Sequence, residues 1–406
     1  MAGCNGSSPD ASTRAAANRR PSAGRGTHRV SWRRLGVIAC ALLTVTSARA
    51  ATAECDTWPQ WQRFKQLYVS GDGRVIDASS TRQVTVSEGQ SYALLFALIA
   101  NDPAMYAKIL RWTQNNLSGA DLTRTLPAWQ WGRSDAGTWG VLDQNSASDA
   151  DLWIAYSLLQ AGSLWHDASY RALGQSMSDR ILAEEVAWVP GLGPTLLPAP
   201  KGFVEHQTWR LNASYLPLQV LRAIGRSSGN RVWRQLLESS QKVIVASARH
   251  GAAADWIGYR QPDGFVTDSQ TQGIGGYDAI RVYLWAGTLS DSDPALKLLS
   301  RQFASVIALA AARPSAPEIL DTDTLRAHGD GSPGFSAALM PLLSRANAQA
   351  ALQAYHTHVS ESALQSDQHY YSDALSLFGL GWIEGRYRFD GNGELKPQWT
   401  VPCTAR

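Results

Sequence analysis

The sequence predicts a mostly helical, single-domain fold arranged as a ring of helical hairpins. Segments with the apolar spacing of helices recur about twelve times from Trp58 onward, and Gly, Pro and Asp separate them. Strand candidates are few and short, and no stretch of linker-like composition divides the chain. Paired helices without a strict repeat favour a helical-hairpin architecture.

The first 50 residues are predicted to be an export signal. Arg33 and Arg34 precede a short apolar stretch at 35–43, and small residues at 48–50 provide a cleavage site. The apolar stretch is too short to span a bilayer. Cleavage near Ala50 would leave a mature chain without a membrane span, in the periplasm or secreted. A disordered basic tail on a cytosolic protein is the alternative.

The basic net charge belongs to this leader. Its 50 residues hold eight arginines and one acidic residue. The rest of the chain has 29 basic and 33 acidic residues, so the net charge falls from +3 to −4. We therefore expect no nucleic-acid partner.

The mature chain, 54–406, is expected to be one catalytic domain with one disulfide. Cys4 and Cys40 leave with the leader, whereas Cys55 and Cys403 remain near the two ends. Two cysteines in an exported protein suggest a bridge that joins the termini, with two free thiols as the alternative.

The predicted elements follow in chain order. Trp58, Trp61, Phe64 and Leu67 mark one face of a first helix. Later helices are predicted at 89–101, 103–116, 147–162, 167–186, 212–226, 230–248, 276–288, 292–311, 333–344, 346–358 and 370–382. Short strands are predicted around 73–77, 139–142 and 195–204. Helix N-caps are predicted at Ser87, Asp102 and Asn212.

Glu88 is the first candidate catalytic residue. It opens a helix that is otherwise almost entirely apolar or small, so the helix should be an inner one whose N-terminal end lies at a rim. A carboxyl that is partly desolvated there would have a raised pKa, as a general acid near neutral pH requires. Ordinary stabilisation of the helix dipole is the alternative.

Asp149 and Asp151 open a second buried helix. Residues two apart on a helix point in different directions, so we expect one to face a pocket and the other to cap a helix. A metal pair is a weaker alternative, because no His or third carboxylate lies nearby in the sequence.

Asp278 opens a third apolar helix, with Arg281 one turn later. Taken alone, this pattern favours an N-cap with an ion pair between residues three apart. Taken together, the three helices would place their acids on one rim of a ring. Converging carboxylates and surplus Trp and Tyr are the components of a sugar-cleaving cleft. The histidines show neither catalytic-triad nor zinc spacing.

The stretch 147–165 resembles the signature of glycoside hydrolase family 8. The wider chain is similar to the branch of this family whose endoglucanases are encoded with bacterial cellulose synthase. Further matching motifs occur in order at 55–59, 87–92, 126–132, 211–217, 277–281, 334–339 and 377–382. Ala213 stands where the family pattern has Pro. The resemblance covers nearly the whole mature chain.

The resemblance implies an (α/α)6 barrel and an inverting endo-β-1,4-glucanase that acts on a cellulose chain without metal or organic cofactor. It implies that Glu88 is the general acid, that Asp278 is the general base, and that Asp149 grips the sugar at the cleavage point. A cellulose synthase or secretion complex is a further candidate partner. Implied substrate-binding residues are Trp131, Tyr215, Tyr277, Arg281, Tyr370 and Tyr371.

Three other readings stay open. The same fold hydrolyses xylan, mixed-linkage glucan or chitosan in other family members. A non-catalytic glucan-binding or scaffold subunit would lack Glu88 or Asp278, and this chain has both. A lyase on a similar barrel would need a Tyr or His base with a cation, and no such cluster is evident in the sequence.

Overall fold

The structure, a computed structural model, describes residues 57–362 and 370–402. These residues all belong to one unit of contacting chain. The leader at 1–50 and the cysteines Cys55 and Cys403 lie outside the described residues. The export signal and the disulfide therefore stay predictions.

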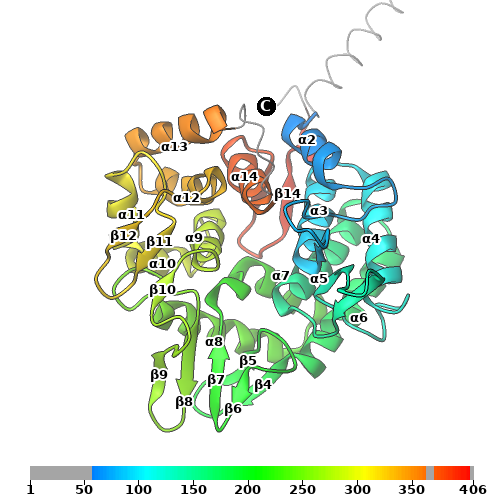
Figure 1. The fold of residues 1–406 in the computed structure, drawn as a ribbon, viewed down its shortest axis with the longest axis horizontal. Helices are drawn as coiled ribbons and strands as arrows, with labels where there is room; N and C mark the ends of the chain where they lie inside the picture. The colour runs from blue at the N-terminus through cyan, green and yellow to red at the C-terminus, as the bar shows by residue number, and fades with distance from the viewer. Residues whose placement is uncertain (1–56, 363–369, 403–406) are drawn as a thin grey trace, which may run out of the picture. The chain divides into compact units, whose positions relative to one another are not determined.

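In the described part of the chain, six largely buried helices form an inner ring (Figure 1). Neighbours in the ring pack against one another, and the ring closes because the last helix contacts the first. Between the third and fourth helices, Gln219 Nε2 donates to Thr288 Oγ1 at 3.1 Å. The inner helices are α3 (Ser87–Ile99), α5 (Ser148–Leu164), α7 (Leu218–Ser228), α9 (Ala279–Thr288), α12 (Pro333–Arg345) and α14 (Tyr370–Ile383).

An outer layer of amphipathic helices covers this ring (Figure 1). In the outer helix 231–247, for example, Trp233, Leu236, Val243 and Ile244 share the buried face. The inner and outer layers form the (α/α)6 barrel, which confirms the predicted fold class. The outer helices are α2 (Pro59–Tyr68), α4 (Pro103–Leu117), α6 (Ala168–Glu184), α8 (Arg231–Ser247), α10 (Leu296–Gln302), α11 (Ala304–Ala311) and α13 (Gln349–Ser362).

Small antiparallel sheets and two 3₁₀ turns lie at the ends of the barrel. The strands are β1 (Thr85–Val86), β2 (Gln130–Arg133), β3 (Trp139–Asp143), β4 (Val186–Val189), β5 (Gly193–Leu196), β6 (Val204–Glu205), β7 (Thr208–Leu211), β8 (Ile257–Arg260), β9 (Gly264–Thr267), β10 (Ile274–Gly275), β11 (Ile319–Asp321), β12 (Ala327–His328), β13 (Tyr387–Phe389) and β14 (Leu395–Pro397). The 3₁₀ turns are η1 (Ala213–Tyr215) and η2 (Gln398–Thr400).

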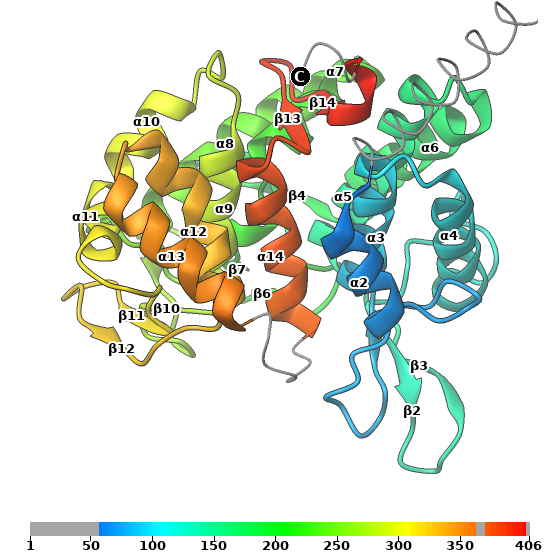
Figure 2. The same cartoon turned by 90° about the horizontal axis from the view of Figure 1, so that it is seen from above.

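The sheets show which end of the barrel holds the helix N-termini. Strands β1, β3, β7, β10 and β12 each come shortly before an inner helix in the chain. Strands β2, β3 and β10–β12 lie toward one end, whereas β13 and β14 lie at the other (Figure 2). The first turns of the inner helices therefore meet at the strand-rich end, as predicted for the three acids.

Several strand predictions were wrong. The predicted strand at 195–204 contains Pro198 and Pro200, which remove ladder donors, and only its first two residues are part of β5. The predicted strand at 73–77 makes only isolated bridges. The strand predicted at 139–142 is confirmed as β3. Most of the other strands were missed because runs of two to five residues carry little pattern.

Two segments that were each predicted as one helix are each divided into two shorter elements. Segment 212–226 divides into η1 and α7 at Pro217, which disfavours a helical conformation in the residue before it. Segment 292–311 divides into α10 and α11 around Phe303, which is buried and packs edge-on against Tyr283.

The cap predictions were right at two of three positions. Asp102 accepts from the Met105 N–H, and Asn212 accepts from the Ser214 N–H. Ser87 is not a cap, because α3 already begins at this residue and its hydroxyl points to Glu88 instead. Among the described residues, no helix is long and apolar enough to cross a membrane.

Candidate active site

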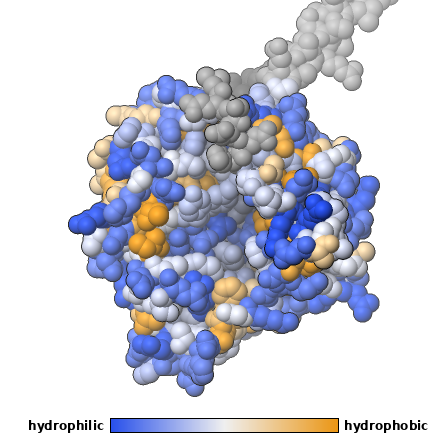
Figure 3. Space-filling model, in the orientation of Figure 1, coloured by the Kyte–Doolittle hydropathy of each residue, from blue (hydrophilic) through white to orange (hydrophobic). Residues whose placement is uncertain are grey.

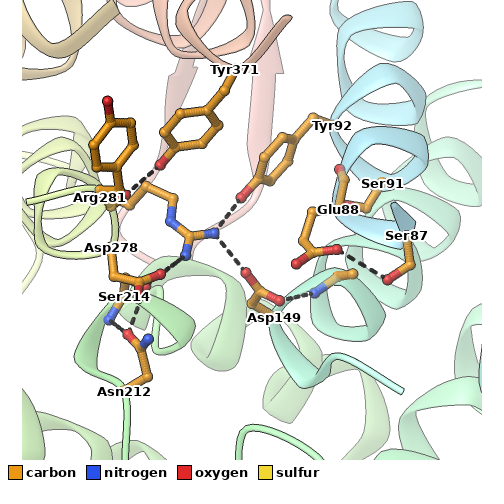
Figure 4. A network of polar contacts seen from close by, with 12 residues as sticks. Ser87, Glu88, Ser91, Tyr92, Asp149, Asn212, Ser214, Asp278, Arg281 and Tyr371 are labelled. Carbon is orange, nitrogen blue, oxygen red and sulfur yellow. Dashed lines mark hydrogen bonds and ion pairs between the residues drawn. The ribbon is translucent and has the colours of Figure 1, made fainter. Parts of the chain in front are cut away.

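The strand-rich end of the barrel carries a depression across its middle (Figure 3). Glu88, Asp149 and Asp278 come from the first turns of α3 and α5 and from the residue before α9. They lie near one another, and Arg281 links Asp149 with Asp278, whereas the Glu88 carboxylate is hydrogen-bonded to Ser87 (Figure 4). The prediction that the three acids converge is thus confirmed in the arrangement of these side chains.

Arg281 is the centre of a polar network. The side chain is buried, and its guanidinium lies between two carboxylates on different helices. One terminal nitrogen lies 2.8 Å from Asp149 Oδ2, and the other lies 2.7 Å from Asp278 Oδ1. Tyr92 Oη and Ser214 Oγ accept further hydrogen bonds, each at 3.0 Å. Charge-assisted bonds of this kind hold α9 and α5 in register at the rim.

Glu88 has no such cation. Ser87 Oγ donates weakly to its carboxylate at 3.4 Å, and among the described residues no ion pair reaches it. Although the residue keeps part of its surface exposed, the surrounding protein desolvates the carboxyl. This desolvation, with the negative charge of Asp149 added, raises the pKa of Glu88 to about 8. The environment therefore favours a protonated Glu88 at neutral pH.

Asp149 is buried, with 2% of its side chain exposed. Its Oδ1 accepts the N–H of Ala150 at 2.8 Å, and its Oδ2 accepts from Arg281. Burial raises the pKa of Asp149 to about 6, against the opposing charge of Arg281. At neutral pH it is an anion that is fixed in one rotamer by two donors.

Asp278 differs from Glu88 in exposure and in charge environment. Its side chain is 26% exposed and forms an ion pair with Arg281. Glu88 and Asp278 lie on opposite sides of the Asp149–Arg281 pair (Figure 4). The predicted ion pair between residues three apart is confirmed, and Asp278 does occupy the N-cap position, but its side chain makes no cap hydrogen bond.

The true cap of α9 is Asp255, which sequence reasoning missed. Its Oδ1 accepts the backbone N–H groups of Gly276, Asp278 and Ala279 at 2.8, 3.1 and 2.7 Å. Gly275 lets the chain pass close to the Ala253 carbonyl, where a Cβ would collide at 2.2 Å. These contacts fix the turn from which Asp278 projects. Nothing in the sequence near Asp255 marks it, since its partners lie more than twenty residues away.

Aromatic side chains flank the carboxylates on the Glu88 side. Trp131 on β2 stacks on Trp139 of β3, with ring centroids 5.4 Å apart and planes 20° apart. Arg74 lies over the Trp131 ring at 4.4 Å. Trp131 pairs with Thr85, three residues before Glu88. The stacked pair of Trp131 and Trp139 therefore lies beside the N-terminal end of α3. Trp131 was predicted, and Trp139 was not.

A second aromatic group surrounds Tyr215. Its ring lies 5.5 Å from the Arg281 guanidinium and 6.3 Å from the ring of Trp256. Trp256 in turn stacks on Phe203 at 5.6 Å with planes 6° apart. Tyr215 thus lies beside Arg281, and its role in binding the substrate stays a prediction. Trp256 and Phe203 were missed; the surplus of Trp was the only signal for Trp256, and nothing in the sequence marked Phe203.

The remaining predicted tyrosines lie on α14 and before α9. Tyr371 Oη donates to the Tyr277 carbonyl at 2.7 Å, and the two rings stack at 6.3 Å. Tyr277 is 56% exposed and forms part of the open surface. Tyr370 is buried instead, and its hydroxyl occupies the space that a Cβ on Gly89 would need. It supports the turn that carries Glu88.

Asp151 does not cap a helix, which corrects one expectation. It is fully buried against Glu185, and neither of its carboxyl oxygens has a donor among the described residues. No group of three His, Cys, Asp or Glu suited to a metal ion occurs within 57–362 and 370–402.

Comparisons with known proteins give a consistent result. Residues 32–385 match the sequence profile of Glycosyl hydrolases family 8. An endoglucanase of Escherichia coli O157:H7 is 43% identical over 370 residues, which cover 91% of this chain and 98% of that protein. One of Xanthomonas axonopodis pv. citri (strain 306) is 43% identical over 371 residues, covering 90% and 95%. The crystal structure of endo-1,4-D-glucanase from Vibrio fischeri ES114 aligns with a TM-score of 0.83 at 42% identity, covering 85% of this chain and all of that one.

Proposed function

The chain belongs to glycosyl hydrolase family 8 and is an endoglucanase, and from this premise we propose that it hydrolyses the β-1,4 bonds of cellulose with inversion. One observation carries the mechanism. Glu88 is desolvated and has no ion pair among the described residues, while Asp278 is paired with Arg281 and partly exposed, on the other side of the Asp149–Arg281 pair. A desolvated carboxyl that keeps its proton and a partly exposed carboxyl that water can reach suit the acid and the base of an inverting glycosidase.

In this mechanism Glu88 gives its proton to the glycosidic oxygen as the bond to the anomeric carbon breaks. Asp278 accepts a proton from a water that attacks the same carbon from the opposite face. Inversion needs space for that water, so the two carboxyls should stand about 6.5–9.5 Å apart. Asp149, fixed by Arg281, accepts hydrogen bonds from the hydroxyls of the sugar at the cleavage point. Each carboxyl thus has a separate role.

The aromatic groups support a long glucan as the substrate. The pair of Trp131 and Trp139 lies on the Glu88 side, and Tyr215, Trp256 and Phe203 form the second group. Aromatic faces stack on the C–H faces of pyranose rings. Platforms away from the reacting carboxyls suit an enzyme that binds several sugars and cleaves within a chain.

The first test is reducing-end release by the purified protein on carboxymethylcellulose, xylan and chitosan. We expect release from carboxymethylcellulose and little from the other two. Faster release from xylan or chitosan would contradict the proposed substrate. No release from any of them, with cellulose still retarding the protein in an affinity gel, would instead favour a glucan-binding subunit.

The activity should fall as the pH rises through about 8. Glu88 must be protonated to act as the acid, and its raised pKa keeps it so below that value. Initial rates of cello-oligosaccharide hydrolysis, measured at a series of pH values on both sides of 8, test this decrease. A rate that stays constant well above pH 8 would exclude Glu88 as the group that titrates.

We also propose that the enzyme acts in the periplasm, after cleavage of its leader near Ala50. The support is the order of Arg33 and Arg34, the apolar stretch and the small residues at 48–50. On this view the domain at 54–406 trims cellulose close to the synthase or secretion complex.

A further inference from the structure

Helices α5 and α6 pack against each other (Figure 1), and two buried acids of this region are not used by the mechanism. Asp151 belongs to the first turn of α5, and Glu185 follows the last residue of α6. Both residues are 0% exposed. They face each other as interacting carboxyls, two residues along α5 from Asp149. Their burial is complete, so bulk solvent does not reach them.

Their hydrogen bonds leave three oxygens without a donor. Ser146 Oγ donates to Glu185 Oε1 at 2.5 Å. Asp151 Oδ1 and Oδ2 and Glu185 Oε2 have no partner among the described residues, and no ion pair there reaches either carboxyl. Two ionised carboxylates in contact cannot donate to each other. A proton held between them would give one of these oxygens a donor.

The neighbouring charges make this proton more necessary. Asp149 and Glu88 act on Asp151 with the same sign, and Asp149 and Glu184 act on Glu185. Arg281 is already bound to Asp149 and Asp278. If every one of these acids were ionised, one buried guanidinium would have to balance several buried negative charges, which folded proteins avoid.

We propose that Asp151 and Glu185 share a proton, and that this pair fixes the first turn of α5 so that Asp149 stays beside Arg281. The pair joins the N-terminal end of an inner helix to the C-terminal end of its outer partner. The Leu197 N–H donates to the Glu185 carbonyl at 2.8 Å, which anchors Glu185 to the strand region as well. The shared proton stands apart from the proposed function, whereas its effect on hydrolysis rests on that function.

The sign of the pH effect on stability follows. Burial raises the pKa of Glu185 to about 8 and raises the pKa of Asp151 well above its ordinary value. An unfolded chain releases these protons from about pH 4 upward. The folded chain therefore holds more protons than the unfolded chain over this range, and the wild type loses stability as the pH rises toward 8.

The test compares the wild type with the isosteric double variant Asp151→Asn/Glu185→Gln. The two amides keep the mutual hydrogen bond but do not titrate. We expect the melting temperature of the variant, relative to the wild type, to rise between about pH 5 and pH 8. A difference that does not change with pH would overturn the shared proton. This readout needs no substrate, so it stands even where hydrolysis fails.

Asp102→Asn is the matched control for this experiment. Burial opposes ionisation of Asp102, but hydrogen bonds from Lys65 and the Met105 N–H hold its pKa below the ordinary value. It is therefore ionised in both folded and unfolded chains above about pH 5, and its loss should lower the melting temperature by a constant amount. If the melting temperature of Asp102→Asn, relative to the wild type, changed with pH as that of the double variant does, the assignment of the shared proton would also be overturned.

The positioning role has its own measurement. The amide variant should keep kcat within about threefold of the wild type, because the contact between α5 and α6 survives. Asp151→Ala removes that contact and should lower kcat by about 100-fold, through displacement of Asp149. An alanine variant as active as the amide variant would overturn the positioning role and leave the proposed hydrolase intact. An inactive wild type would overturn the hydrolase alone.

Discussion

Glu88→Gln is expected to lower kcat on cello-oligosaccharides by about 1000-fold and to leave glucan binding nearly unchanged. Glutamine keeps the shape of the side chain but has no acidic proton for the leaving oxygen. Initial rates and affinity electrophoresis on cellulose measure the two quantities. Glu184→Gln is the control, since Glu184 lies on the outer helix α6 in an ion pair with Arg180 and should leave the rate unchanged.

A substrate with a better leaving group tests the role of Glu88 as the acid more directly. A 2,4-dinitrophenyl cello-oligosaccharide releases an anion that needs no protonation. On that substrate Glu88→Gln should be far less impaired, because the missing proton is no longer required. Retained hydrolysis of ordinary cello-oligosaccharides by the variant would contradict the assignment of Glu88 as the acid.

Asp278→Asn is expected to lower kcat by about 1000-fold as well, but on both kinds of substrate. The attacking water still has to lose a proton, however good the leaving group is. The asparagine carbonyl can accept from Arg281, so the network should persist. Rates on the ordinary and the activated substrate test this contrast.

Asp263→Asn is the matched control for this substitution. Asp263 also forms an ion pair with an arginine three residues away, Arg260, but in the turn between β8 and β9. Its loss should leave hydrolysis unchanged. If the activated substrate restored Asp278→Asn as well as Glu88→Gln, the two residues would not divide the roles of base and acid.

The inner helices could be predicted because burial leaves a strong pattern in the sequence. Nearly every residue of α3 and α5 is apolar or small, so Glu88 and Asp149 stand out against their surroundings. The same contrast marks Asp278 at the start of α9. The convergence of these acids follows once the helices form a closed ring.

The parts that could not be predicted depend on contacts between distant segments. Asp255 caps a turn more than twenty residues away, and Glu185 meets Asp151 across a helical hairpin. Trp256 acquires its place beside Tyr215 only through the fold. None of these residues lies in a local pattern that separates it from an ordinary loop residue.

The most direct measurement of the central claim is the anomeric configuration of the first product. Hydrolysis of a β-1,4-linked cello-oligosaccharide is followed by proton NMR from its earliest minutes, before mutarotation. If Glu88 is the acid and Asp278 activates water on the opposite face, the new reducing end appears first as the α-anomer. A β-anomer first would mean retention through a glycosyl-enzyme, and would contradict the division of roles between these two carboxyls.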